Sequence, residues 1–222
     1  MRSTNKHGIQ LPQLPKSLPA QAVAQLEDHG EYASIALNDG DFTQQAASHV
    51  TFEQVHFRRS IFTRSRLIKV RLADVRLETC DLSGADWEKA RLVRVELNGC
   101  RLIGVQLLEA QLESVFVREC NLEDAALVSA KFKAARFEKC NLRGASFEQA
   151  DLSRVVFKEC NLTNVNLQGT KLAGTDLRGS IIDGLQVGAK ELQGVIVDRV
   201  QAVQIAGLLG IVVKDGDDLD GA

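Results

Sequence analysis

A five-residue period governs most of this chain of 222 residues. From Phe42 to Val197, an apolar residue stands at every fifth position without a gap. A small or branched residue usually stands two positions before each apolar centre, with a polar residue between them, as in Val95-Glu96-Leu97. This alternation is typical of a short strand with one buried face. The period therefore predicts a solenoid of short strands.

The other two residues of each unit are mostly polar or glycine. Nine of the 17 glycines stand at the second of these two positions, namely Gly84, Gly99, Gly104, Gly144, Gly169, Gly174, Gly179, Gly184 and Gly194. Glycine suits the positive φ that a type II turn requires. We therefore expect each unit to form a three-residue strand followed by a corner.

The cysteines indicate how many corners close one coil. All five share the same inward position and recur at every fourth unit of the repeat: Cys80, Cys100, Cys120, Cys140 and Cys160. Like residues stack on like when four consecutive units close one coil, which then has four sides. We expect about eight coils over residues 40–199, with the cysteines as a structural ladder in the core. Each thiol is a coil away from the next, which does not favour a metal site.

The segment before the repeat, residues 1–39, is predicted to be an arm followed by a capping helix. Pro19 suits a first helical turn, and Ala22, Val23 and Leu26 would share one face of a helix over residues 19–28. Tyr32, Ile35 and Leu37 already fit the five-residue register, so we expect an irregular first coil there.

The segment after the repeat, residues 200–222, is predicted to cap the other end. Asp198 suits an N-cap and Gln201 completes the spacing of a capping box. Gly210 would end the helix, Ile211-Val212-Val213 would form a short strand, and an acidic tail would follow. Caps are expected because the open edges of a β-solenoid invite aggregation.

Composition narrows the class of protein. The formal net charge is −2 and the pI is about 6.1, which excludes a generally basic nucleic-acid binder. No apolar stretch is long enough to span a membrane. The first residues lack the apolar segment of a signal peptide, so we expect a cytoplasmic protein with reduced thiols. No phosphate-binding loop or HExxH motif is present, and we predict no enzyme activity, no catalytic or metal-binding residues and no cofactor.

The repeat resembles that of a known family. CDLSG (80–84), CNLRG (140–144), ADLSR (150–154) and TDLRG (175–179) resemble the A(D/N)LXX consensus of pentapeptide repeat proteins. The resemblance implies an all-β fold, the right-handed quadrilateral β-helix of that family. The predicted C-terminal helix and strand also resemble the module through which Qnr and MfpA proteins dimerise. Those relatives bind bacterial type II topoisomerases, and some protect DNA gyrase from quinolones.

The resemblance implies a non-enzymatic interaction protein that binds DNA gyrase or topoisomerase IV and modulates the enzyme or protects it from a topoisomerase poison. It also implies a homodimer that buries the apolar residues of the C-terminal module. These dimerisation candidates are Val200, Val203, Leu208, Leu209, Ile211 and Val213.

Two alternatives remain open. The chain could be a scaffold for an unrelated protein partner, which would contact outward apolar residues, the candidates being Leu108, Val128, Phe116 and Val156. It could instead bind nucleic acid through a basic girdle around two early coils, made of Arg58, Arg59, Arg64, Arg66, Lys69, Arg71 and Arg76. Nucleic acid is the less favoured partner because no aromatic residues are interleaved on the outer positions of the girdle.

Overall fold

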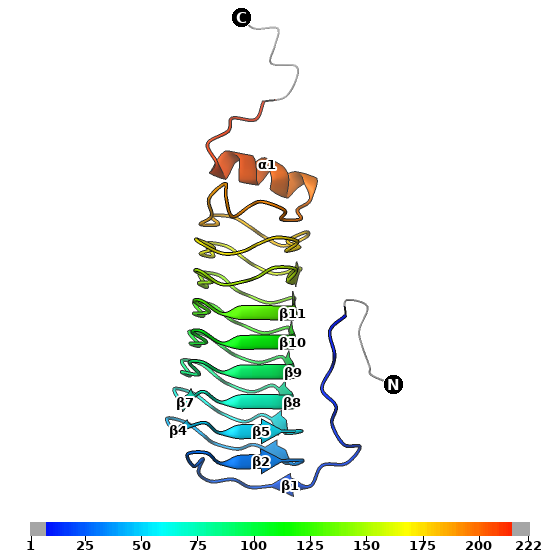
Figure 1. The fold of residues 1–222 in the computed structure, drawn as a ribbon, viewed down its shortest axis with the longest axis vertical. Helices are drawn as coiled ribbons and strands as arrows, with labels where there is room; N and C mark the ends of the chain where they lie inside the picture. Colours follow the sequence, from blue (N-terminus) through cyan, green and yellow to red (C-terminus); the bar gives the residue numbers. More distant parts are fainter. Residues whose placement is uncertain (1–7, 215–222) are drawn as a thin grey trace, which may run out of the picture.

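The computed structural model describes residues 8–214 and forms a parallel β-solenoid, as the repeat predicts. Figure 1 shows an elongated rod with an N-terminal arm beside it and one helix across the far end. The start of the predicted arm, residues 1–7, and the predicted acidic tail, residues 215–222, lie outside the described residues.

Short parallel strands stack along the rod axis. The strands are β1 (Ala20–Gln21), β2 (Glu31–Ala33), β3 (Ala36–Asn38), β4 (Ala46–Ser48), β5 (Thr51–Glu53), β6 (His56–Arg58), β7 (Arg66–Ile68), β8 (Arg71–Glu78), β9 (Arg91–Asn98), β10 (Gln111–Arg118), β11 (Lys131–Glu138) and β12 (Val156–Lys158). The main sheet runs in the order β1-β3-β6-β8-β9-β10-β11-β12, with β2 and β5 beside it, and β4 pairs with β7.

The predicted coil of four repeat units is confirmed by the stacking register. The same register runs from the pair Glu31 and Thr51 to the bridge between Asp176 and Ile196. The first coil therefore begins at about the position that Tyr32 indicates. On the outer surface, a residue therefore lies beside the residues one full coil before and one full coil after it. These neighbours determine which surface charges are paired.

The apolar centres and the small residues before them fill the rod. Phe42, Phe62 and Trp87 are buried together near one end, and their rings pack 4.8–5.5 Å apart. Trp87 also donates from Nε1 to Ser65 Oγ at 3.3 Å, which satisfies its buried indole N–H. Each large side chain buried in this way contributes roughly 1.5–3 kcal/mol to folding.

The corners use the backbone conformation that the glycines predict. Gly104 has φ +63° and Gly174 has φ +75°, and the other seven glycines of the set agree. Many non-glycine residues take the same conformation at equivalent corners, for example Ala134 at φ +57°. The closed four-sided coil imposes this conformation at corners where the sequence supplies no glycine.

The predicted helix over residues 19–28 is wrong. This segment contains strand β1, and the backbone N–H of Ala36 donates to the carbonyl of Pro19 at 2.9 Å. The side-chain amide of Gln45 makes two hydrogen bonds to the backbone of this segment. Its Oε1 accepts from Leu26 N, and its Nε2 donates to Ala24 O. The first coil leaves a strand edge unpaired, and pairing this edge satisfies more backbone groups than a short, weakly amphipathic helix would.

The predicted C-terminal helix is confirmed as α1 (Arg199–Leu208), with the expected capping box. Gln201 N donates to Asp198 Oδ1, and Asp198 N donates to Gln201 Oε1, each at 3.0 Å. Gly210 follows at φ +78°. Among the described residues, no helix has the length and apolar character to cross a membrane.

The predicted strand over residues 211–213 is wrong. A strand needs a neighbouring backbone with which to pair. In the described part of the chain, these three residues pair with no other strand.

Candidate interaction surfaces

Neighbouring coils largely neutralise the basic girdle. Arg59 Nε and Nη2 each donate to Asp39 at 2.7 Å, and Arg76 Nε donates to Glu96 at 2.8 Å. Arg58 pairs with Glu78, and Arg66 pairs with Asp86, both at 3.3 Å. Each of these partners stands one full coil from its arginine. The acidic residues that balance the girdle therefore lie mostly outside its own stretch of sequence.

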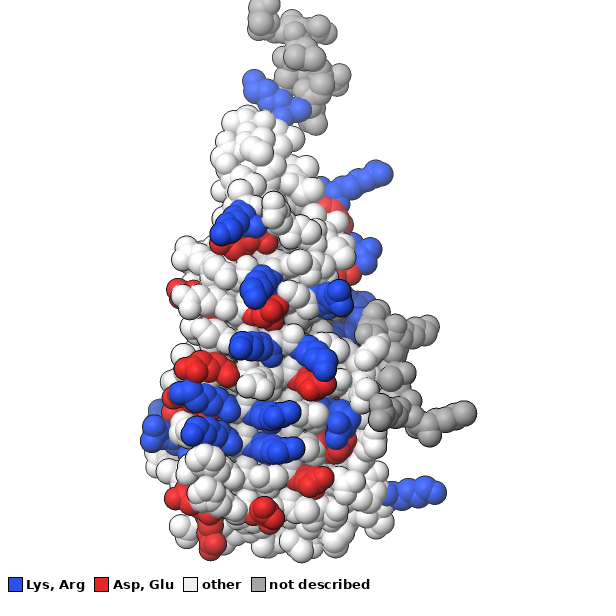
Figure 2. Space-filling view, in the orientation of Figure 1, with Lys and Arg blue, Asp and Glu red and all other residues white. Residues whose placement is uncertain are grey.

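Three cations of the girdle, Arg64, Lys69 and Arg71, have no ion pair within residues 8–214. Arg71 lies in register with Arg91, so two exposed cations stack there. Figure 2 shows several Lys and Arg side chains together over the lower half of the visible face, with acidic side chains among and around them. This face is mixed in charge.

The outward apolar candidates fall into two groups. Leu108 and Val128 lie one coil apart and are both half-buried. Phe116 and Val156 are also half-buried, but Arg136 lies between them in the register of β10, β11 and β12. The second pair therefore forms no continuous apolar patch. Three other outward residues, Ile61, Ile181 and Ile196, are more exposed and were not predicted, although the same register rule could have found them.

Helix α1 presents its apolar side to solvent. Val200 is 71% exposed and Val203 is 52% exposed, whereas Gln201 is only 3% exposed. Gln201 Nε2 donates to the carbonyls of Leu177 and Ser180, both at 2.7 Å. The polar residue therefore docks the helix on the rod. The other dimerisation candidates, Leu208, Leu209, Ile211 and Val213, are exposed as well.

The cysteine ladder is buried and all five thiols are free. The Cys120 sulfur donates to the carbonyl of Arg118 at 3.1 Å, and Cys140 donates to the carbonyl of Glu138. Hydrogen bonding to Cys100 and burial both raise the pKa of the Cys80 and Cys120 thiols. Within the described residues, no group of His, Cys, Asp and Glu side chains could hold a metal ion.

The N-terminal arm lies on the wall that carries His56. The backbone N–H of Gln13 donates to Asp74 Oδ1 at 2.9 Å, and Gln54 Nε2 donates to the carbonyl of Gln13. His56 is 7% exposed, and its Nε2 lies 3.1 Å from Glu78. Burial lowers the pKa of His56, and Glu78 partly opposes this effect. The arm and this wall enclose a hollow of about 500 Å³ that includes His56 and Arg76.

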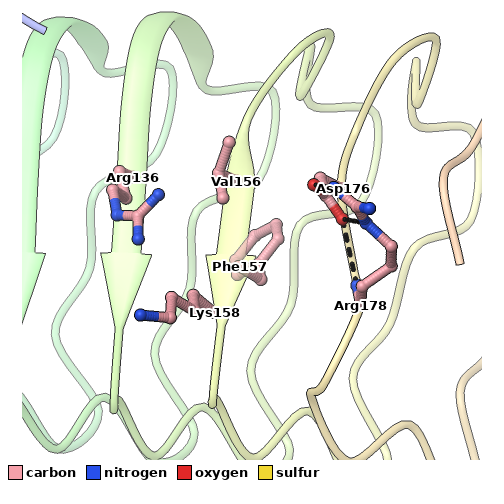
Figure 3. Close-up of a pocket in the computed structure, with 6 residues that line it drawn as sticks. All are labelled: Arg136, Val156, Phe157, Lys158, Asp176 and Arg178. Carbon is pink, nitrogen blue, oxygen red and sulfur yellow. Dashed lines mark hydrogen bonds and ion pairs between the residues drawn. The ribbon is translucent and has the colours of Figure 1, made fainter. Parts of the chain in front are cut away.

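A second hollow, of about 510 Å³, lies farther along the same wall. Its lining residues are Arg136, Val156, Phe157, Lys158, Asp176 and Arg178. Figure 3 shows the Arg136 guanidinium on one side of Val156 and the Asp176 carboxylate on the other. Arg178 Nε and Nη2 donate to the two oxygens of Asp176 at 2.9 and 2.7 Å, and this lowers the pKa of Asp176. Val156 was predicted as an outward contact residue, whereas the charged residues around it were not predicted.

The repeat and its geometry match a known family. The family model described as a pentapeptide repeat region matches residues 50–127 and 70–143. A second model, described as pentapeptide repeats, matches residues 140–179 with eight copies. Together these matches cover more than half of the chain, which belongs to the pentapeptide repeat family. No curated protein sequence matches the chain significantly.

Several solved structures resemble the chain. A trypsin-treated form of QnrB1, a plasmid-mediated fluoroquinolone resistance protein, is 21% identical with a TM-score of 0.50, covering 83% of this chain and 100% of its own. HetL, involved in heterocyst differentiation regulation in the cyanobacterium Nostoc sp. strain PCC 7120, is 22% identical with a TM-score of 0.27 over 78% of this chain and 91% of its own. A pentapeptide repeat protein of the Arabidopsis thaliana thylakoid lumen is 25% identical with a TM-score of 0.41, over 53% of this chain and 75% of its own.

Proposed function

We propose that this protein is a non-enzymatic, cytoplasmic interaction protein that forms a homodimer through its C-terminal module. The main support for a dimer is the orientation of α1, which buries Gln201 and exposes Val200 and Val203. Contiguous apolar surface of this kind marks an interface. A second copy of the chain is the proposed occupant because a two-fold axis at the rod end would bury the same patch on both copies.

The oligomeric state in solution tests the dimer. We expect sedimentation velocity to give a dimer for the natural sequence and a monomer for the double variant Val200→Asp/Val203→Asp. Ile61→Asp is the matched control, because Ile61 is also exposed but stands near the other end of the rod. A monomer for the natural sequence, or a dimer that survives the double variant, contradicts this interface.

We further propose that the partner is a bacterial type II topoisomerase, DNA gyrase or topoisomerase IV. Membership of the pentapeptide repeat family supports an interaction role, and the C-terminal helix, which resembles the helical part of the dimerisation module of Qnr and MfpA, supports this target. The mixed charge in Figure 2 does not favour simple mimicry of duplex DNA by that face. A supercoiling assay with and without a quinolone tests the proposal, and unchanged activity at a large molar excess of the protein contradicts it.

A scaffold for another protein is the second candidate. Leu108 and Val128 favour it because they are outward, apolar and one coil apart. If they contact the partner, Leu108→Asp and Val128→Asp should abolish its recovery in a pull-down. Nucleic-acid binding through the basic girdle is the weakest candidate, because four of its seven cations are paired. It predicts steep salt dependence that is lost on neutralising Arg64, Arg66 and Arg71.

A further inference from the structure

The hollow beside Val156 results from a short side chain between two long ones. Arg136, Val156 and Asp176 stand in register on three successive coils. Because Val156 reaches less far than either neighbour, the wall is indented there (Figure 3). The indentation has an apolar floor and charged ends, the combination typical of a small ligand site.

Arg136 is an unusual residue for the outer wall of a rod. It is only 6% exposed, although outward cations such as Lys158 and Arg178 remain largely exposed. Its one hydrogen bond in the described part of the chain runs from Nε to Glu138 Oε2 at 3.2 Å. Its Nη1 and Nη2 groups, with four N–H donors, face the hollow and have no acceptor among residues 8–214 (Figure 3).

The surrounding charges select among anions. Arg178 neutralises Asp176 through two hydrogen bonds. Glu138 accepts from Arg136 Nε and lies 3.5 Å from the ammonium of Lys158. One planar, singly charged group can therefore bind the free edge of Arg136 in the two-pronged geometry that guanidinium favours. A phosphate dianion would meet repulsion from the nearby carboxylates of Glu138 and Asp176.

We propose that this hollow binds a carboxylate of an acidic peptide segment in a partner protein, with Arg136 as the anchor and Val156 as the apolar floor. The side chains that flank the acidic residue in the peptide would cover Val156. The proposal goes beyond the proposed function because it specifies the chemistry of a ligand at a site that the dimer and topoisomerase proposals do not use. The test of the hollow needs no topoisomerase, so the peptide-binding proposal and the topoisomerase proposal can fail separately.

The test uses the full-length protein and a short blocked peptide that alternates Glu and Val. Isothermal titration measures its affinity beside that of a Gln–Val counterpart, and NMR follows the Arg136 Nε–H resonance. We expect the Glu–Val peptide to bind at least about tenfold more tightly than its counterpart and to shift that resonance. Inorganic phosphate should leave the resonance unshifted at equal concentration.

Two variants assign the binding to the hollow. Arg136→Lys keeps the positive charge but loses the paired donors, and Val156→Met fills the indentation without altering Arg136. Each should weaken peptide binding at least about tenfold. Val93→Met is the matched control, because Val93 is a half-buried outward residue of β9 on the neighbouring wall. Equal binding of the two peptides, binding of neither, or binding unaffected by both hollow variants overturns the proposal.

Discussion

Gln201, at the start of helix α1, donates a hydrogen bond from its side-chain amide to the backbone carbonyl of Leu177 at 2.7 Å. The same amide nitrogen donates to the carbonyl of Ser180. One buried glutamine therefore joins the helix to two backbone carbonyls of the rod and leaves the apolar residues of the helix on the outside. This arrangement links the capping of the rod to its proposed dimer interface.

Gln201→Ala is expected to loosen this end of the rod. Losing the amide leaves the carbonyl of Ser180 without a partner among the described residues, at a cost of about 1–3 kcal/mol, whereas the carbonyl of Leu177 still accepts from Ser180 N at 3.1 Å. Hydrogen exchange should accelerate in α1 and the last coil and stay unchanged near β9. Gln204→Ala is the control, because within residues 8–214 its amide donates only to Asp183, at the surface. Equal exchange in the two variants would show that Gln201 does not hold the cap.

Gly104→Ala is expected to lower the stability of the rod by about 1 kcal/mol. A side chain at Gly104 would meet nothing within 4 Å, so the cost comes only from its φ of +63°. Gly207 in α1 is the matched control, since it also has open space but lacks a positive φ. Gly207→Ala should stabilise the helix by up to about 1 kcal/mol. Thermal unfolding of both variants measures the contrast, and a shift in the same direction for both would contradict it.

His56 is expected to make the protein less stable in mild acid. Burial lowers its pKa in the folded state, so the unfolded chain binds the proton more readily. The folded state therefore has its full stability, with His56 neutral, above the unfolded pKa of about 6.5. This part of the stability is lost as the pH falls through the pKa of the folded state. His56→Gln should flatten denaturant-measured stability over this window. An unchanged pH profile in His56→Gln would refute the assignment.

The cysteine ladder is expected to be chemically inert in the folded protein. All five side chains are buried, so a reagent in solution cannot reach the sulfur atoms while the rod is folded. A thiol reagent at about pH 8 should modify none of the five thiols in the native protein and all five after unfolding. Rapid modification of the native protein would instead indicate a reactive site in the ladder.

The core was predictable because a single periodic rule describes it. Apolar centres such as Leu77 and Leu97 determine the buried face of each strand, and the spacing of the cysteines determines the coil. Helix α1 was predictable for a local reason, since its capping box lies within four consecutive residues.

The surface was less predictable because its contacts join residues that are distant in sequence. Arg59 is neutralised by Asp39, which precedes it by a full coil. Arg136 is buried between Phe116 and Val156, its register neighbours on the coils before and after, and the segment after Pro19 pairs with a strand edge that exists only in the folded rod. Local propensity carries no information about such contacts.

Binding to purified DNA gyrase and topoisomerase IV tests the central proposal most directly. The protein is expected to bind at least one of the two enzymes, and the double variant Val200→Asp/Val203→Asp should bind at least about tenfold more weakly, because a dimer presents two copies of the contact surface. Ile61→Asp should bind like the natural sequence. Failure of the natural protein to bind either enzyme at a large molar excess would contradict the proposed function.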